Sequence, residues 1–242
     1  MSLLTEPPRC FALVPCAGLG LRAGAGGPKQ YALLAGQAVV AHTVAALAQV
    51  ARLTATLVVL SPGDTEFTGA VPGFRGWVAH CGGETRAQSV ANGLSALRER
   101  GAADDDWVLV HDAARCLVRP QWVDRLIDAC LPDPVGGLLA LPLADTLKHA
   151  AADGANRVAA TVPRAGKWAA QTPQMFRLGL LGQGLNHALQ HALQPAAGDV
   201  TDEASAIEAL GLAPLLVPGD MENFKLTWPA DFALARRLLE TR

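Results

Sequence analysis

Short apolar runs recur through the sequence at intervals that suit strands separated by helices. Most of the runs are continuous rather than alternating, as is usual for strands that helices cover on both faces of a sheet. Their residue ranges are 11–15, 54–60, 77–80, 107–110 and 137–141, followed by a later pair near 214–217 and 223–227. We expect each of these runs to form a β-strand.

Several of the segments between these apolar runs show the periodicity of an α-helix. In the segment 85–100, Val90, Leu94 and Leu97 fall on one stripe, which indicates an amphipathic helix. One proline directly precedes 121–131 and another precedes 230–240, and the first turn of a helix is a favoured place for proline. The alternation predicts an α/β fold: a Rossmann-like, doubly wound and mainly parallel sheet in a single domain over residues 1–242.

The segment 143–172 interrupts this alternation, because it has no helical stripe. It contains the turn signal Ala-Asp-Gly-Ala-Asn at 152–156, and Val158, Thr161 and Val162 follow it. We expect a protruding β-hairpin arm here. Two strands alone cannot bury enough surface, so the arm is expected to pack against a partner, most simply a second copy of the chain. An arm folded back on its own domain is the alternative.

Composition narrows the classes of partner. The net charge of −2 and the pI of about 6.3 favour neither a nucleic-acid surface nor a membrane surface. The five cysteines form no C-x-x-C pair, and the sequence carries no secretion signal and no long apolar run of membrane-spanning length. We therefore expect a cytoplasmic protein with free thiols.

A glycine-rich loop follows the first predicted strand. Five of the 13 residues from 16 to 28 are glycine, and Arg22 and Lys29 accompany them. Glycines allow backbone N–H groups to approach a ligand closely, and two cations beside them indicate a polyphosphate. The order A-G-x-G-x-R and then P-K is typical of nucleotidyltransferases. A P-loop is excluded because Pro28 precedes Lys29, and the glycines and Pro28 oppose the helix that a dinucleotide fingerprint needs.

Polar groups follow two more predicted strands, at the sheet edge where ligands of open α/β sheets bind. After the third run come two glycines, Glu84 and a helix that carries Ser89, whose hydroxyl can distinguish the edges of a base. After the fourth run comes Asp112, which could bind ribose hydroxyls, substrate hydroxyls or a metal ion. A helix cap at Thr85 and a strand-end turn at Asp112 are the ordinary structural alternatives.

Two other clusters are expected to have no catalytic role. Three aspartates at 104–106 resemble a metal motif of glycosyltransferases, but they precede a strand, so we expect a solvated turn. His187 and His191 lie four residues apart without the glutamate of a zinc-protease motif, so we expect them at the surface.

Blocks spread over nearly the whole chain resemble one family, the 2-C-methyl-D-erythritol 4-phosphate cytidylyltransferases of the non-mevalonate isoprenoid pathway. The blocks are VPCAGLGLR with PKQY, GGETRAQSV, VLVHDAAR, LPLADTLK, TVPR, WAAQTPQMF, VTDEASAIEALG and ENFKLTWPAD, in family order from about Phe11 to Leu239. HDAAR together with TDEASA and N-x-K-x-T narrows the resemblance to this family and its polyol-phosphate relatives. The chain departs from the usual Pro, Asp and Arg of the family at Cys116, Glu84 and Trp228, respectively.

The resemblance implies a set of site residues. Catalytic cations are implied at Arg22, Lys29, Arg164 and Lys225. The matching nucleotide-binding positions are Pro15, Cys16, Ala17, Gly18, Gly20, Gly83, Glu84, Ser89, Asp112 and Ala113. The positions around the second substrate are Asp112, Arg115, Thr146, Arg164, Thr201 and Lys225. Among these, Thr146 and Arg164 lie on the arm, from which the family contacts the site of the neighbouring subunit.

By this resemblance the chain is expected to transfer CMP from CTP to 2-C-methyl-D-erythritol 4-phosphate. The products would be 4-diphosphocytidyl-2-C-methyl-D-erythritol and pyrophosphate. The resemblance also implies Mg²⁺, held mainly through the CTP phosphates, and a homodimer formed through the arm. Three alternatives remain open: a ribitol-5-phosphate cytidylyltransferase, a sugar-phosphate nucleotidyltransferase that uses UTP or GTP, and a non-catalytic nucleotide-sensing module.

Overall fold

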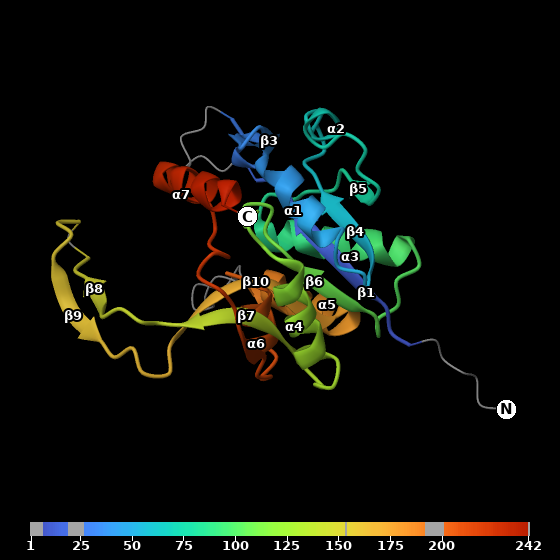
Figure 1. Cartoon of the computed structure of the whole chain (residues 1–242). Coiled ribbons are helices and arrows are strands. Elements are labelled where there is room, and N and C mark those ends of the chain that lie inside the picture. Colours follow the sequence, from blue (N-terminus) through green and yellow to red (C-terminus); the bar gives the residue numbers. More distant parts are fainter. Residues whose placement is uncertain (1–6, 19–26, 153, 192–200, 242) are drawn as a thin grey trace.

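A seven-stranded sheet forms the centre of the computed structural model (Figure 1). The structure describes residues 7–18, 27–152, 154–191 and 201–241. The strands are β1 Cys10–Pro15, β4 Leu53–Val59, β5 Trp77–Ala79, β6 Trp107–Val110, β7 Gly136–Pro142, β10 Trp168–Arg177 and β11 Leu215–Pro218. Their order is β11-β7-β10-β6-β1-β4-β5, in which β10 is antiparallel to both neighbours and the other pairs are parallel. The predicted mainly parallel α/β sheet is confirmed.

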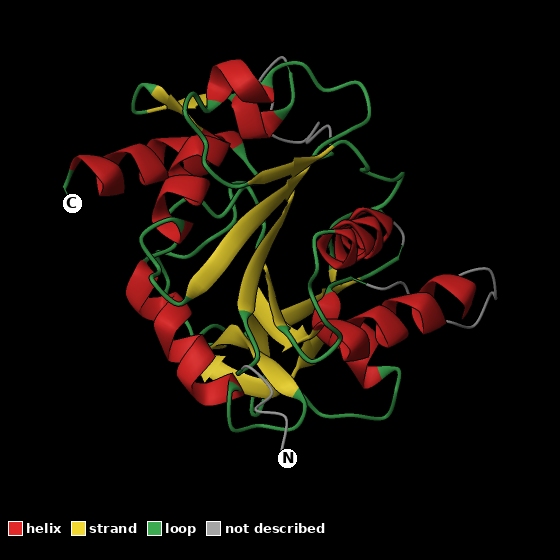
Figure 2. Ribbon diagram, turned by 90° about the vertical axis from the view of Figure 1, so that its right-hand side faces the viewer, coloured by secondary structure: helices red, strands yellow, loops and turns green. Residues whose placement is uncertain are grey.

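Helices cover both faces of this sheet (Figure 2). On one face lie α1 Val39–Leu47 and α4 Pro120–Cys130, and on the other lie α3 Arg86–Glu99, α5 Leu178–His191 and α6 Glu203–Glu208. Other elements outside the central sheet are the 3₁₀ helix η2 Lys29–Tyr31, the short strands β2 Leu33–Leu34 and β3 Gln37–Ala38, and the helices α2 Phe67–Ala70 and α7 Pro229–Glu240. None of the described helices combines the length and the apolar character that crossing a bilayer requires.

Strand β1 shows why the predicted strands are continuous apolar runs. Phe11 and Leu13 pack beneath α3 and α5, whereas Ala12 and Val14 pack beneath α1 and α4, and all four side chains are fully buried. Because successive side chains of a strand point to opposite faces, a sheet covered on both sides needs apolar residues at every position. Each fully buried large side chain contributes roughly 1.5–3 kcal/mol.

The predicted helices begin where their sequence signals indicate. The Thr85 side chain caps α3 by accepting a hydrogen bond from the backbone N–H of Gln88 at 3.1 Å. Pro120 and Pro229 occupy the first positions of α4 and α7, where a missing N–H group has no intrahelical partner to lose.

The prediction of a strand at 223–227 is wrong. Asn223 Nδ2 donates to the carbonyl of Thr172 at 2.8 Å, and the backbone N–H of Leu226 donates to the carbonyl of Ala114 at 2.9 Å. Isolated hydrogen bonds of this kind hold the segment in place of a strand ladder. Its apolar positions pack against the core without a neighbouring strand.

Strand β10 was not among the predicted strands, and its first residues fall inside the segment 143–172. It lies between β6 and β7, and its register with β7 shifts between Ala170 and Gln174. Gln171, Thr172 and Gln174 interrupt its apolar pattern, yet all three are buried. Their polar side chains are satisfied by partners distant in the sequence, so the local pattern gives little sign of a central strand.

The expected β-hairpin is present as a separate two-stranded sheet. It pairs β8 Leu147–Ala150 with β9 Val158–Val162 in antiparallel fashion and extends away from the rest of the molecule (Figure 1). Val158 is 62% exposed on it. Packing of this hairpin and its flanking residues 143–146 and 163–167, which together we call the arm, against a second copy of the chain remains a prediction.

The aspartate run 104–106 does not form the fully solvated turn that was expected, because Asp106 is buried. Its Oδ1 atom accepts a hydrogen bond from the backbone N–H of Arg9 at 2.8 Å, and its Oδ2 atom lies 2.7 Å from Arg9 Nη2. The N–H group of Ala103 also donates to Oδ2 at 2.8 Å. Burial acts to raise the pKa of Asp106, but these bonds outweigh it and hold the pKa below its ordinary value.

We predict that Asp106→Asn lowers the free energy of unfolding by about 1–3 kcal/mol near neutral pH, because a buried charge-assisted network is lost. Since the folded-state pKa is depressed, the carboxylate stabilises the fold above its ordinary pKa, and the advantage of the wild type shrinks as the pH falls below about 4. Urea unfolding across this range measures both effects. The exposed neighbour provides the control, Asp105→Asn, and an equal loss in that variant would contradict the assignment.

Candidate active site

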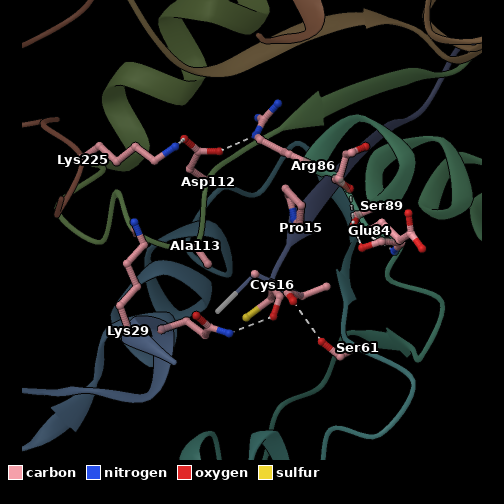
Figure 3. A pocket seen from close by; sticks show the side chains of 16 residues that line it. Pro15, Cys16, Lys29, Ser61, Glu84, Arg86, Ser89, Asp112, Ala113 and Lys225 are labelled. Atoms are coloured by element: carbon pink, nitrogen blue, oxygen red, sulfur yellow. Dashed lines mark hydrogen bonds and ion pairs between the residues drawn. The ribbon is translucent and has the colours of Figure 1, made fainter. Parts of the chain in front are cut away.

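A pocket of about 550 Å³ lies at the carboxyl ends of β1, β4 and β6 (Figure 3). The chain leaves β1 toward β4, whereas β6 flanks β1 on the opposite side, so the strand order reverses at this point. Open α/β sheets bind ligands at such a switch point. The lining residues are Pro15, Cys16, Ala17, Gly18, Lys29, Gln30, Ser61, Gly83, Glu84, Thr85, Arg86, Ser89, Asp112, Ala113, Ala114 and Lys225.

The backbone that follows β1 is held by side chains from two other segments. Gln30 Nε2 donates to the carbonyl of Cys16 at 3.1 Å, and Ser61 Oγ donates to the carbonyl of Ala17 at 3.0 Å (Figure 3). Burial raises the pKa of the Cys16 thiol to about 12. The thiol therefore stays protonated near neutral pH and is not a nucleophile.

The loop after β5 packs directly against the loop after β1. A Cβ atom on Gly82 would lie 2.3 Å from the Cβ atom of Ala17 and 2.8 Å from the carbonyl oxygen of Leu60, so only glycine fits there. Beside it, Ser89 Oγ accepts from the N–H of Gly83 at 3.0 Å and donates to the carbonyl of Thr85 at 2.9 Å. The pocket wall on this side is thus a rigid, close-packed backbone.

Asp112 is the centre of an ionic cluster on the opposite wall. It is only 7% exposed, and its Oδ1 atom accepts from Arg86 Nε at 2.9 Å while its Oδ2 atom lies 2.8 Å from Lys225 Nζ (Figure 3). Arg115 Nε lies 3.8 Å from the same Oδ2 atom. Burial acts to raise the pKa of Asp112, but Arg86, Lys225 and Arg115 outweigh it and hold the pKa far below its usual range. The carboxylate is therefore ionised throughout the physiological range.

A second carboxylate lies behind Arg86. Glu203 is fully buried, and its two oxygens accept from Arg86 Nη1 at 2.7 Å and from Nη2 at 3.0 Å. Burial raises the pKa of Glu203, and Arg86 opposes this rise. Burial would lower the pKa of Arg86, but Glu203 and Asp112 together raise it. Two parallel bonds of this kind give the strongest geometry for an arginine–carboxylate pair.

His111 is buried next to this cluster without carrying charge. Its Nδ1 atom lies 3.1 Å from Thr172 Oγ1, and its Nε2 atom lies 3.1 Å from the carbonyl oxygen of Arg115. Burial lowers the pKa of His111 to about 4, so the ring is neutral near pH 7. Thr172 Oγ1 also accepts from the backbone N–H of Asp112 at 3.0 Å, which orients the turn that carries the aspartate.

Comparison with known proteins decides the family. The family model described as IspD, 2-C-methyl-D-erythritol 4-phosphate cytidylyltransferase, matches residues 10–241. The chain belongs to this family. Its resemblance to the cytidylyltransferases, inferred from the sequence blocks, is thereby confirmed, and with it the predicted class of enzyme.

Individual relatives in the IspD family are similar over nearly the whole chain. The bifunctional enzyme IspD/IspF of Albidiferax ferrireducens is 60% identical over 236 residues, which are 97% of this chain and 54% of that protein. The chain therefore spans about half the length of this relative. The 2-C-methyl-D-erythritol 4-phosphate cytidylyltransferase of Burkholderia multivorans is 51% identical over 233 residues, 96% of each chain. A crystal structure of a 4-diphosphocytidyl-2C-methyl-D-erythritol synthase superposes with a TM-score of 0.80 at 39% identity, covering 97% of this chain and 100% of that one.

Most of the site residues predicted from the IspD resemblance line the pocket. They are Pro15, Cys16, Ala17, Gly18, Lys29, Gly83, Glu84, Ser89, Asp112, Ala113 and Lys225. Arg115 does not line the pocket, and its Nη1 atom donates to the carbonyl of Asn223 at 2.7 Å. Thr201 precedes α6 and is exposed, and Thr146 and Arg164 lie on the parts of the arm that flank its two strands. Gly20 and Arg22 lie outside the described residues.

The structure adds four residues that the sequence interpretation had not assigned: Gln30, Ser61, Arg86 and Glu203. Arg86 carries a positive charge in the first turn of α3, where the helix dipole disfavours cations. This unfavourable placement, visible in the sequence, could have indicated that Arg86 has an acidic partner. Glu203 shares a helix face with the buried Ala206 and Ile207, and a carboxylate on an apolar face is a similar signal. No sequence signal marks Gln30 or Ser61, because their role is to bind the backbone carbonyls of Cys16 and Ala17, which only the folded structure brings near them.

The described residues contain no group of three or more His, Cys, Asp or Glu side chains that could hold a metal ion. Within the pocket, Asp112 is a candidate ligand by type, but its two oxygens are occupied by Arg86 and Lys225.

Proposed function

We propose that the chain transfers CMP from CTP to 2-C-methyl-D-erythritol 4-phosphate and releases pyrophosphate, in the synthesis of isoprenoid precursors. One observation carries this proposal beyond family membership: Lys29 and Lys225 line the same pocket although they lie far apart in sequence. Lys29 Nζ donates to the carbonyl of Leu226 at 3.0 Å, so the start of η2 and the C-terminal segment meet at the pocket. Two cations converging on one cleft suit a reaction between two anions.

The chemistry requires charge placement rather than proton transfer. The phosphate of the polyol substrate is already an anion and attacks the α-phosphorus of CTP, with pyrophosphate leaving in line. Lys29 would stabilise the phosphoryl oxygens and the departing pyrophosphate, while Lys225 would fix the attacking phosphate. The protonated Cys16 thiol and the neutral, fully buried His111 fit this scheme, because neither is needed as a nucleophile or a base.

The nucleotide would lie between the two loops at the switch point. We assign recognition of cytosine to Gly83, Glu84 and Ser89, beside the rigid wall formed by the loop after β5. The backbone of residues 15–18 would approach the triphosphate, together with Arg22 and Gly20 from the same loop. Asp112 and Ala113 line the opposite wall and would face the nucleotide from there.

Mg²⁺ would enter with CTP and be held mainly through its phosphates. This cation prefers an octahedral shell completed by water and substrate phosphates and needs few protein carboxylates. Both oxygens of Asp112 are bound by Arg86 and Lys225, which is compatible with that arrangement because Mg²⁺ requires no cage of protein carboxylates. When bound, Mg²⁺ neutralises charge on the triphosphate.

The exposed arm is an argument for a homodimer in which the arm of each chain would complete the active site of the other. Its two strands bury little surface by themselves, and Val158 is largely exposed on it. We propose that Thr146 and Arg164 reach the polyol phosphate of the neighbouring subunit, together with Arg115 and Thr201 of the subunit that binds it. The five cysteines are all free thiols, which supports the expected cytoplasmic location.

The function is tested by measuring pyrophosphate release with each nucleotide and acceptor. We expect turnover with CTP, 2-C-methyl-D-erythritol 4-phosphate and Mg²⁺, and we expect kcat/KM at least about tenfold lower with UTP, GTP or ribitol 5-phosphate. Preference for ribitol 5-phosphate would reassign the acceptor. The absence of pyrophosphate release with every acceptor would favour a nucleotide-sensing module.

Lys29→Ala should lower kcat by about 10²–10³-fold without unfolding the protein, because one preorganised cation is lost from the transition state. Steady-state kinetics and thermal unfolding measure the two effects. Arg75→Ala is the control, since Arg75 is an exposed cation that does not line this pocket. Near-normal turnover of the Lys29 variant would rule out its assigned role.

Complementation tests whether the arm acts across a dimer. Arg164→Ala and Lys29→Ala should each retain little activity alone, but unfolding and refolding them together should restore about a quarter of wild-type activity. Half of the dimers are then mixed, and each mixed dimer has one site with an intact body and an intact arm. Mixing Lys29→Ala with Lys225→Ala restores nothing, because both changes lie in the body. No recovery in the first mixture would show that Arg164 does not act in the neighbouring subunit.

A further inference from the structure

Arg86 lines the pocket, but all three of its nitrogen atoms donate to carboxylates rather than facing an open site. Nη1 and Nη2 donate to Glu203, and Nε donates to Asp112 at 2.9 Å. The side chain of Arg86 is 27% exposed, whereas that of Glu203 is only 1% exposed. Glu203 does not line the pocket, and its carboxylate is linked to the pocket by its contact with Arg86.

Glu203 is held in place by contacts that do not involve Arg86. Gln174 in β10 donates from Nε2 to Asp202 Oδ2 at 2.9 Å and accepts from the backbone N–H of Ala204 at 2.7 Å. Asp202 also caps α6 by accepting from the N–H of Ser205 at 3.0 Å. The residues on both sides of Glu203 are therefore fixed, and the carboxylate is an anchored partner to which the guanidinium must conform.

The geometry continues from Arg86 into the pocket. Nη1 and Nη2 are bound to Glu203, and the Nε atom of Arg86 donates to one oxygen of Asp112, Oδ1. The other oxygen remains for Lys225 Nζ at 2.8 Å. The chain of contacts runs from Glu203 through Arg86 and Asp112 to Lys225, and it joins α6, α3, the turn after β6 and the segment before α7.

We infer that Glu203 is a positioning residue for the transfer reaction: it confines Arg86 to one edge of Asp112, so that Asp112 can orient Lys225 toward the attacking phosphate. This inference rests on the proposed function. Without the Glu203 carboxylate, the freed Nη groups of Arg86 turn to both oxygens of Asp112 or to a phosphate of the nucleotide. In either case Lys225 loses its fixed partner.

The test is Glu203→Gln, which keeps the size of the side chain and removes its charge. We expect the KM for 2-C-methyl-D-erythritol 4-phosphate to rise and its kcat/KM to fall about 10- to 100-fold, the range for losing a hydrogen bond to a charged group. The KM for CTP should not rise, since the residues assigned to cytosine are untouched. KM does not depend on the fraction of folded enzyme, so this difference between substrates separates positioning from a loss of structure.

Glu208→Gln is the matched control. It makes the same substitution on the same helix, at an exposed position outside the pocket, and should leave both KM values unchanged. Equal changes in the two KM values of Glu203→Gln, or no change in either, would overturn the inference. Failure of the wild-type enzyme to turn over would instead overturn the proposed function.

A double-mutant cycle supplies a readout that remains valid if a single variant folds poorly. Arg86→Gln alone leaves Glu203 buried without its cation, so adding Glu203→Gln should raise the melting temperature again. The double variant should have the same kcat/KM as Arg86→Gln, within about twofold, because Glu203 acts only through Arg86. Independent, multiplying losses of kcat/KM, or a melting temperature that falls further, would show that Glu203 acts by another route.

Discussion

The structure depends on a buried carboxylate, Asp112, that must be kept ionised. A charge removed from water is tolerated only where opposite charges and hydrogen bonds replace its hydration. Here the replacements come from α3, from the turn after β6 and from the segment before α7, which supply Arg86, Arg115 and Lys225. One electrostatic requirement thus brings three distant parts of the chain to the same edge of the sheet.

The C-terminal segment is the part of the fold most clearly organised by this requirement. It forms no strand, yet Asn223 is fully buried and donates to the carbonyl of Thr172, and Leu226 packs in a small cluster beneath α7. Polar contacts and a few apolar side chains therefore close one wall of the pocket. Between these two buried positions, Lys225 Nζ lies 2.8 Å from Asp112 Oδ2.

The fold determines which groups near the pocket carry a charge, and the proposed chemistry follows from those charges. Burial keeps the Cys16 thiol protonated and the His111 ring neutral, so both residues contribute packing and hydrogen bonds. The cations remain, at Lys29, Lys225 and Arg86. A transfer between two anions needs such charges in fixed positions, because a preorganised cation costs no reorganisation when charge develops. Anchoring of Arg86 and Lys225 by buried carboxylates is consistent with that need.

The sequence by itself determined the α/β class, most strands and helix starts, the hairpin and most of the pocket residues. These features follow from short-range signals: continuous apolar runs, prolines and caps at helix starts, a turn motif, and glycine and charge patterns that match one family. Only the tertiary structure decided that 223–227 forms no strand and that β10 lies between β6 and β7. It also decided that Asp106 is buried and that Arg86 pairs with Glu203. Each of these depends on polar groups far apart in the chain, and the cost of burying such a group is set by a partner that local sequence cannot reveal.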